Sequence, residues 1–151
     1  MRKALLGILL GVTVICQPVQ CEAHERQSPK PIELSYEDAQ ELMQIAWCEA
    51  GNQGVDGQLY VMSCIWNRAN SESDAWPDTI HGVIHQKGQF ATKGMSKAQI
   101  TPETHYALAL LEMGNVIPEI VAFERKESDF LDAYFTEAFD YRDHTFYTTK
   151  H

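Results

Sequence analysis

The order of apolar and polar residues predicts a helix that begins at Ser35. Ser35 can cap the amides of the first turn, and Asp38 follows three residues later in the capping-box position. The next apolar positions are spaced by three or four residues, as on one face of a helix: Ala39, Leu42, Ile45 and Ala46. Gly51 with Asn52 then ends the pattern, because these residue types favour helix C-termini.

A second helix is predicted over residues 55–70. Its middle is apolar on nearly all sides: Leu59, Tyr60, Val61, Met62, Cys64, Ile65 and Trp66. A helix without a polar face is expected to be buried on all sides. We therefore expect this segment to be the central helix of the core, with Asn67 and Arg68 tying its end to neighbouring loops.

Shorter elements are predicted in the second half of the chain. After a break at residues 76–78, a short helix passes through Ile80, Val83 and Ile84, and residues 86–94 predict a loop because they hold two glycines. Pro102 is at the first position of a further helix that stops at Gly114. Residues 119–123 and 145–148 predict strands. The acidic, aromatic stretch between them, 128–143, has no clear assignment.

The N-terminus has the pattern of a secretory signal peptide. Arg2 and Lys3 precede an apolar run over residues 4–16, and polar residues follow from Gln17. We place the cleavage near Ala23, with an uncleaved anchor as the alternative. This gives a signal peptide (1–23), a linker (24–34) and one domain (35–151), and it predicts a secreted or cell-envelope protein without a stable membrane span.

Composition narrows the classes of partner. The 151 residues hold 12 Lys and Arg against 21 Asp and Glu, a formal charge of −9, so binding to nucleic acid is not expected. We expect a monomer. Export would expose Cys48 and Cys64 to an oxidising compartment, where they either form a disulfide or stay as buried free thiols.

Glu49 is the one charged residue that breaks the helical pattern. It lies seven residues after Leu42 and four after Ile45, on the face that points into the core. It is also in the last turn of its helix. Desolvation and the helix dipole there both favour a protonated carboxylic acid, the form needed to donate a proton to a glycosidic oxygen. The alternative is that Glu49 reaches solvent at the helix end.

The ordered motifs resemble the cell wall hydrolases of the spore cortex-lytic type, the SleB/CwlJ family. The likeness extends over nearly all of residues 37–148. The matching pieces are Glu49-Ala50, Gly57-Gln58, Asn67-Arg68, and residues 76–80, 82–86, 88–90 and 144–147. The chain departs from the family at Cys48, where the family usually has glycine, and at Gln53, where it has glutamate.

The resemblance implies an α+β fold: a mainly helical, lysozyme-like domain with a small antiparallel sheet. It implies cleavage of peptidoglycan glycan strands between N-acetylmuramic acid and N-acetylglucosamine, with Glu49 as the acid. The sequence offers no convincing second carboxylate, and Asp56 is expected to face solvent. A single acid fits a lytic transglycosylase without a cofactor, although hydrolysis by water stays open, as does the choice between vegetative wall and spore cortex.

By analogy, the glycan would contact five side chains: Gln53, Gln89, Phe90, His144 and Tyr147. Core packing is an equal alternative for Phe90 and Tyr147. Two other classes of function stay open. One is a catalytically inactive peptidoglycan-binding domain. The other is a metal-dependent peptidase, since His81 and His85 have the spacing of metal ligands; only His144 suggests itself as a third ligand, so we expect no metal.

Overall fold

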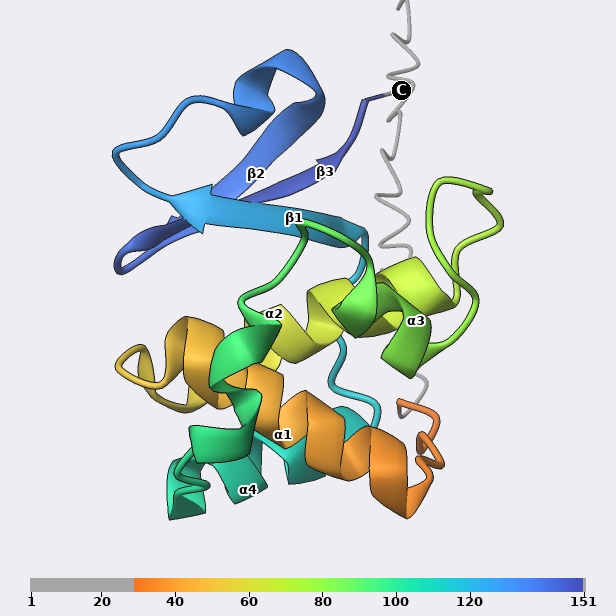
Figure 1. Ribbon diagram of the computed structural model, residues 1–151. Helices are drawn as coiled ribbons and strands as arrows, with labels where there is room; N and C mark the ends of the chain where they lie inside the picture. The colour runs from red at the N-terminus through yellow and green to blue at the C-terminus, as the bar shows by residue number, and fades with distance from the viewer. Residues whose placement is uncertain (1–28, 151) are drawn as a thin grey trace, which may run out of the picture.

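Helices precede a small antiparallel sheet in the computed structural model, which describes residues 29–150 (Figure 1). The elements follow in this order: α1 (Tyr36–Ala50), α2 (Gly54–Ala69), α3 (Ile80–His85), the 3₁₀ helix η1 (Thr92–Lys97), α4 (Pro102–Glu112), β1 (Ile120–Arg125), the 3₁₀ turn η2 (Leu131–Ala133), β2 (Phe135–Tyr141) and β3 (His144–Thr149). This confirms the predicted α+β class.

The first helix begins and ends where the sequence predicts. Ser35 caps α1 by accepting a hydrogen bond from the Asp38 backbone N–H at 3.0 Å. Its hydroxyl donates in turn to the Asp38 carboxylate at 2.8 Å. At the other end, the Gly51 N–H donates to the Trp47 carbonyl oxygen and closes the last turn.

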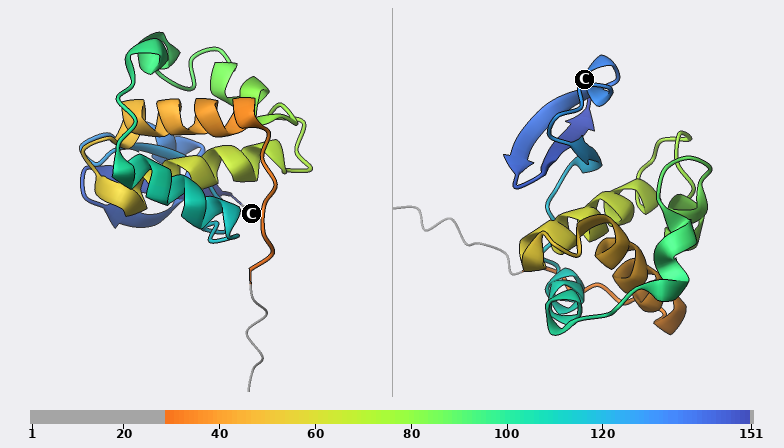
Figure 2. Two further views of the ribbon diagram at one scale, coloured as in Figure 1. Left: turned by 90° about the horizontal axis from the view of Figure 1, so that it is seen from below. Right: turned by 60° about the vertical axis from the view of Figure 1, so that its left-hand side comes forward.

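The second helix is the centre of the molecule, as predicted. Figures 1 and 2 show α2 between the sheet on one side and α1 and α4 on the other. Val61, Met62 and Ile65 are fully buried in the core that the helices share. On the other face, Cys64 packs with residues of the sheet in a second, smaller core. One apolar helix therefore joins both cores.

The sheet has the strand order β1-β3-β2, with both pairings antiparallel. The two predicted strands are confirmed as β1 and β3. The third strand, β2, lies in the stretch that the sequence left unassigned. It is an edge strand with no buried residue, so its apolar positions give only a weak alternation. Tyr60 of α2 packs edge-on against Phe139, Tyr141 and Phe146 and so fixes the hairpin of β2 and β3 on the helix.

Two segments expected to be irregular pack against the helical core. The loop over residues 86–94 ends early, because η1 begins at Thr92 and buries Met95 in the helical core. Residues 29–34, the described part of the predicted linker, pack along the domain: the Ile32 N–H donates to the Glu112 carbonyl oxygen at 2.8 Å. Leu34 also packs against the core.

The predicted signal peptide, residues 1–23, lies outside the described residues. Within residues 29–150, no helix combines the length and apolarity that crossing a membrane requires.

Candidate functional site

A cleft of about 1130 Å³ lies between the end of α1, the loop after α3 and the sheet. Its walls come from segments far apart in the chain: Cys48 to Gln53, Arg68, Trp76, residues 86–91, β1, residues 127–135 and the start of β3. A concave surface of this size can take a ligand of several rings. Five of the six site residues predicted from the sequence line it: Glu49, Gln53, Gln89, Phe90 and His144.

Glu49 lies in the last turn of α1 and is half-buried in the wall of this cleft. Its Oε1 accepts a hydrogen bond of 2.8 Å from the Ala91 backbone N–H. Among residues 29–150, Oε2 has no hydrogen-bond partner. The side chain is therefore oriented by the loop after α3 while one carboxyl oxygen is left for a ligand.

That loop is tied to the core through Arg68. The buried guanidinium donates from Nε to the Val121 carbonyl oxygen and from Nη1 to Gln89 Oε1 at 3.0 Å. It also lies over the ring of Phe90, 5.4 Å from the centroid.

Asn67, the neighbouring residue at the end of α2, donates to the carbonyl oxygens of Ile117 and Ile120. The predicted roles of Asn67 and Arg68 in joining the helix to neighbouring loops are confirmed. Gln89 accepts from Arg68 through its oxygen, and its amide Nε2 has no hydrogen-bond partner within the described chain.

Gln53 is buried at the base of the cleft, and its polar atoms are occupied. Its Nε2 donates to Asn52 Oδ1 and to Asp143 Oδ2, both at 2.9 Å, and its Oε1 accepts from the Asp143 N–H at 3.3 Å. Gly57 permits this arrangement, because a Cβ there would lie 2.3 Å from the Gln53 Cβ. Gln53 thus joins the α1–α2 loop to the β2–β3 turn; its predicted contact with glycan stays a prediction.

His144 and Tyr147 lie on β3 in different surroundings. His144 is buried beside the cleft, and its Nδ1 has no partner among the described residues. Burial lowers the pKa of His144, an effect that Asp143 partly opposes and Arg125 reinforces. Tyr147 is buried away from the cleft lining, which favours its alternative as a core residue.

The Tyr147 hydroxyl lies 2.9 Å from Glu124 Oε1 and 3.0 Å from Asp132 Oδ1. The Glu124 carboxylate also accepts hydrogen bonds from Ser128 Oγ at 2.5 Å and from the Leu131 N–H at 3.1 Å. Burial raises the pKa of Glu124, but the hydrogen bonds that it accepts outweigh this and bring the pKa below its ordinary value. Glu124 is thus an ionised anchor for the segment that follows β1.

That segment carries two aromatic side chains that the sequence analysis did not single out. Phe130 and Tyr134 both line the cleft, although 67% and 60% of their surfaces are exposed. Their ring centroids are 5.5 Å apart. Exposed aromatic rings beside a cleft are the type of surface on which sugar rings stack. One signal in the sequence could have indicated them. Both lie in the unassigned acidic stretch, 128–143, where no buried element was predicted to take up aromatic side chains.

The structure also corrects the search for a second carboxylate. Glu124, Glu127 and Asp143 all line the cleft together with Glu49. The sequence did not show them because they reach the site only through the sheet. Asp56 is exposed at the start of α2, as predicted, and lies outside the cleft lining. The absence of a second carboxylate, which favoured transglycosylation in the sequence analysis, therefore no longer distinguishes it from hydrolysis.

Both cysteines of the described chain are free. Cys64 is buried in the sheet-side core, and burial raises the pKa of its thiol to about 12. Cys48 lines the cleft; burial and then the negative charge of Glu49 raise the pKa of its thiol. The structure thus favours free thiols over a disulfide.

Comparison with known proteins agrees with this geometry. The fold is a mainly helical, lysozyme-like domain with a small antiparallel sheet, and its cleft holds a half-buried glutamate. A family model described as Cell Wall Hydrolase matches residues 52–147. The chain therefore belongs to the Cell Wall Hydrolase family, as the sequence motifs predicted. The matched segment begins three residues after Glu49, so the match itself does not include that residue.

Two solved structures share the fold. The catalytic domain of the Bacillus cereus SleB protein is 20% identical, with a TM-score of 0.63, over 78% of this chain and 94% of that one. The catalytic domain of the germination-specific lytic transglycosylase SleB from Bacillus anthracis is 21% identical, with a TM-score of 0.62, over 79% and 100%. No curated protein matches the sequence.

Proposed function

We propose that this protein is a lytic transglycosylase that cleaves peptidoglycan glycan strands with Glu49 as its general acid and base. The observation that carries the proposal is the placement of Glu49: one oxygen is held by the Ala91 N–H, and the other is unpaired within the described chain, in a cleft that exposed aromatic rings border. The B. anthracis protein that shares the fold is itself described as a lytic transglycosylase.

In the proposed reaction Glu49 would first donate a proton and then accept one. Glu49 Oε2 would donate its proton to the glycosidic oxygen as the bond from that oxygen to C1 of N-acetylmuramic acid breaks. The 6-hydroxyl of the same sugar would then attack C1, and its proton would return to the Glu49 carboxylate. The products are a 1,6-anhydromuramoyl end and a free 4-hydroxyl on N-acetylglucosamine, and no water is consumed.

The cleft that holds Glu49 also offers suitable surfaces for a glycan. Phe90 lies in the loop that holds Glu49, and Phe130 and Tyr134 border the cleft from the segment after β1. The unpaired Nε2 of Gln89 can donate to a sugar hydroxyl or acetamido oxygen. These groups would hold the strand by stacking and by a few directed hydrogen bonds, which suits a neutral sugar backbone.

Hydrolysis is the second candidate, and a specific observation supports it. Asp143 lines the same cleft as Glu49, and Gln53 orients its Oδ2. An ionised carboxylate across the scissile bond could activate a water molecule, as in two-carboxylate glycosidases. Its product would have a reducing muramic acid end instead of the anhydro form.

The products distinguish these reactions. Purified sacculi, from both vegetative cells and spores, are digested with the protein, and the soluble fragments are analysed by mass spectrometry before and after borohydride reduction. Anhydro-muropeptides, which borohydride leaves unchanged, support the proposal. Fragments that gain two hydrogens on reduction would replace it with hydrolysis. Binding to sacculi without soluble fragments from either wall would instead indicate the inactive binding domain.

A further inference from the structure

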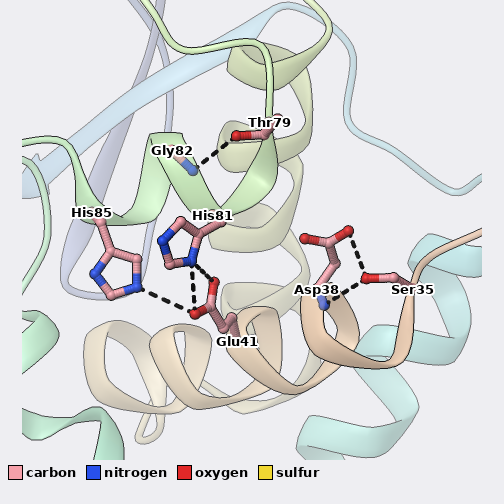
Figure 3. A network of polar contacts seen from close by, with 7 residues as sticks. All are labelled: Ser35, Asp38, Glu41, Thr79, His81, Gly82 and His85. Carbon is pink, nitrogen blue, oxygen red and sulfur yellow. Dashed lines mark hydrogen bonds and ion pairs between the residues drawn. The ribbon is translucent and has the colours of Figure 1, made fainter.

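A second cluster of chemically active side chains lies outside the cleft, on the face formed by α1 and α3 (Figure 3). Glu41 of α1 points toward His81 and His85 of α3, and the three side chains bring their ligating atoms within 4.8 Å of one another. His81 Nδ1 is 3.0 Å from both Glu41 oxygens, and His85 Nε2 is 3.3 Å from Glu41 Oε1. None of the three residues lines the cleft.

We propose that Glu41, His81 and His85 form a zinc site that fastens α3 to α1. Two imidazole nitrogens and one carboxylate oxygen are a ligand set that suits Zn²⁺, whereas Ca²⁺ and Mg²⁺ require oxygen ligands. Water would occupy the remaining position.

The separations between Glu41 and the two histidines are close to what a tetrahedral zinc ion needs. Bonds of about 2.0–2.1 Å place neighbouring ligand atoms roughly 3.3–3.4 Å apart. His81 Nδ1 and His85 Nε2 lie 3.0 and 3.3 Å from Glu41 oxygens, which approaches that value. The two histidine nitrogens lie within 4.8 Å of each other. The His81 side chain is 68% exposed, so it can rotate by the small amount that ligation requires without disturbing the core.

The fold explains why these residues meet. His81 and His85 are four residues apart and therefore share one face of α3. Thr79 caps this short helix by accepting from the Gly82 N–H at 3.1 Å, which sets where it begins (Figure 3). Gly82 also takes the position after the first histidine where a zinc peptidase would carry its glutamate base. The site therefore lacks the general base with which a zinc peptidase of this motif activates water.

The proposed zinc site lies next to the loop that holds Glu49. His85 is the last residue of α3, and the loop that follows it carries Gln89, Phe90 and the Ala91 N–H that holds Glu49. Glu41 lies eight residues before Glu49 on α1, about 12 Å along the helix axis. Zinc would therefore fix the start of this loop relative to the helix that carries Glu49.

Calorimetric titration of the chelator-treated full chain with Zn²⁺ tests the site. The expected result is one zinc ion per chain, with affinity reduced roughly 10- to 100-fold in Glu41→Gln, His81→Asn and His85→Asn. His105→Asn is the matched control, because His105 is an exposed histidine on α4, away from the cluster. At a zinc concentration of about 100 times Kd, Tm should rise by roughly 10 °C in the wild type and the control only.

Hydrogen exchange gives a readout that does not depend on catalysis. Zinc should slow amide exchange across residues 80–91 in the wild type and leave exchange unchanged in Glu41→Gln. Absence of zinc binding, or binding equally tight in all four variants, would overturn the proposal and leave the cluster as an ordinary histidine–glutamate ion pair. Since the wild type and the control are measured without reference to activity, neither result depends on the proposed lytic reaction.

Discussion

Gln53 and Asp143 are 90 positions apart in the chain, yet the Gln53 amide donates to the Asp143 carboxylate at 2.9 Å and accepts from the Asp143 backbone N–H at 3.3 Å. This pair joins the loop after the Glu49 helix to the turn between β2 and β3. An amide can donate to a carboxylate and accept from an N–H at once, which an ionised glutamate cannot do. Gln53, where the resemblance led us to expect glutamate, thus has a structural partner in Asp143.

Glutamate at this position should destabilise the fold. Gln53→Glu puts a second carboxylate beside that of Asp143 and removes the donor. Because residue 53 is buried, we expect the free energy of unfolding to fall by about 3 kcal/mol. Urea denaturation measures the loss. Gln53→Glu with Asp143→Asn should recover most of it, since the new amide can donate to the new carboxylate. Gln99→Glu, at an exposed position, is the control. A Gln53→Glu variant as stable as the wild type would contradict the pairing.

The exposed aromatic pair should contribute to binding and not to folding. Phe130→Ala and Tyr134→Ala each remove a stacking surface worth about 1 kcal/mol, so affinity for sacculi should weaken roughly five-fold in each variant. Thermal denaturation should show an unchanged Tm, because both rings are mostly exposed. Tyr106→Ala removes a similarly exposed ring from α4 and should leave the affinity unaltered. Equal affinities in all three variants would exclude this surface from glycan binding.

His144 should make stability depend on pH. Burial lowers its pKa in the folded state, so the folded protein binds its proton less readily than the unfolded chain does. The contribution of neutral His144 to the free energy of unfolding is fully present above pH 6.5, the ordinary pKa of histidine. It is lost as the pH falls through the lower pKa of the folded state. The free energy of unfolding should therefore drop between about pH 7 and pH 5 more steeply in the wild type than in His144→Gln. The His105→Asn variant, changed at an exposed position, should keep the wild-type dependence of the free energy of unfolding on pH. The same dependence in His144→Gln would refute the role of His144.

The two cysteines should differ in reactivity. Cys64, with its pKa raised to about 12 by burial, should resist iodoacetamide at pH 8 in the folded protein. Cys48 should react slowly, and several-fold faster in Glu49→Gln, because the charge that helps to raise its pKa is then gone. Glu37→Gln, at an exposed position of the same helix, should react like the wild type. Peptide mapping after labelling gives the rates, and a Cys48–Cys64 disulfide in unreduced protein would contradict the structure.

The helical half of the fold could be predicted because its signals are local. Ser35, the glycine at position 51 and Pro102 mark helix ends, and the apolar surface of α2 identifies it as the central helix. The edge strand β2 could not be predicted in this way. Its side chains pack on one face only in part, so the alternation that marks a buried strand is missing.

The site was predictable only where its residues share a helix or loop with a motif. Glu49 stands out because it breaks a periodic pattern, and Gln89 and Phe90 lie in a glycine-containing loop. Glu124, Glu127 and Asp143 reach the cleft through the strand order β1-β3-β2, in which the last strand inserts between the two earlier ones. That pairing depends on contacts distant in the chain. Glu41 escaped notice for a similar reason, because its partners come 40 residues later.

The central claim is that Glu49 carries the catalytic proton, and a matched pair of variants tests it most directly. Glu49→Gln keeps the size of the side chain and an oxygen that can accept from the Ala91 N–H, but it cannot donate an acidic proton. Sacculi are digested with wild type, Glu49→Gln and Glu37→Gln, and anhydro-muropeptides are counted by mass spectrometry. The account predicts a loss of at least about 100-fold in Glu49→Gln alone, with unchanged binding to sacculi and unchanged Tm. Release of anhydro-muropeptides by Glu49→Gln at the wild-type rate would contradict it.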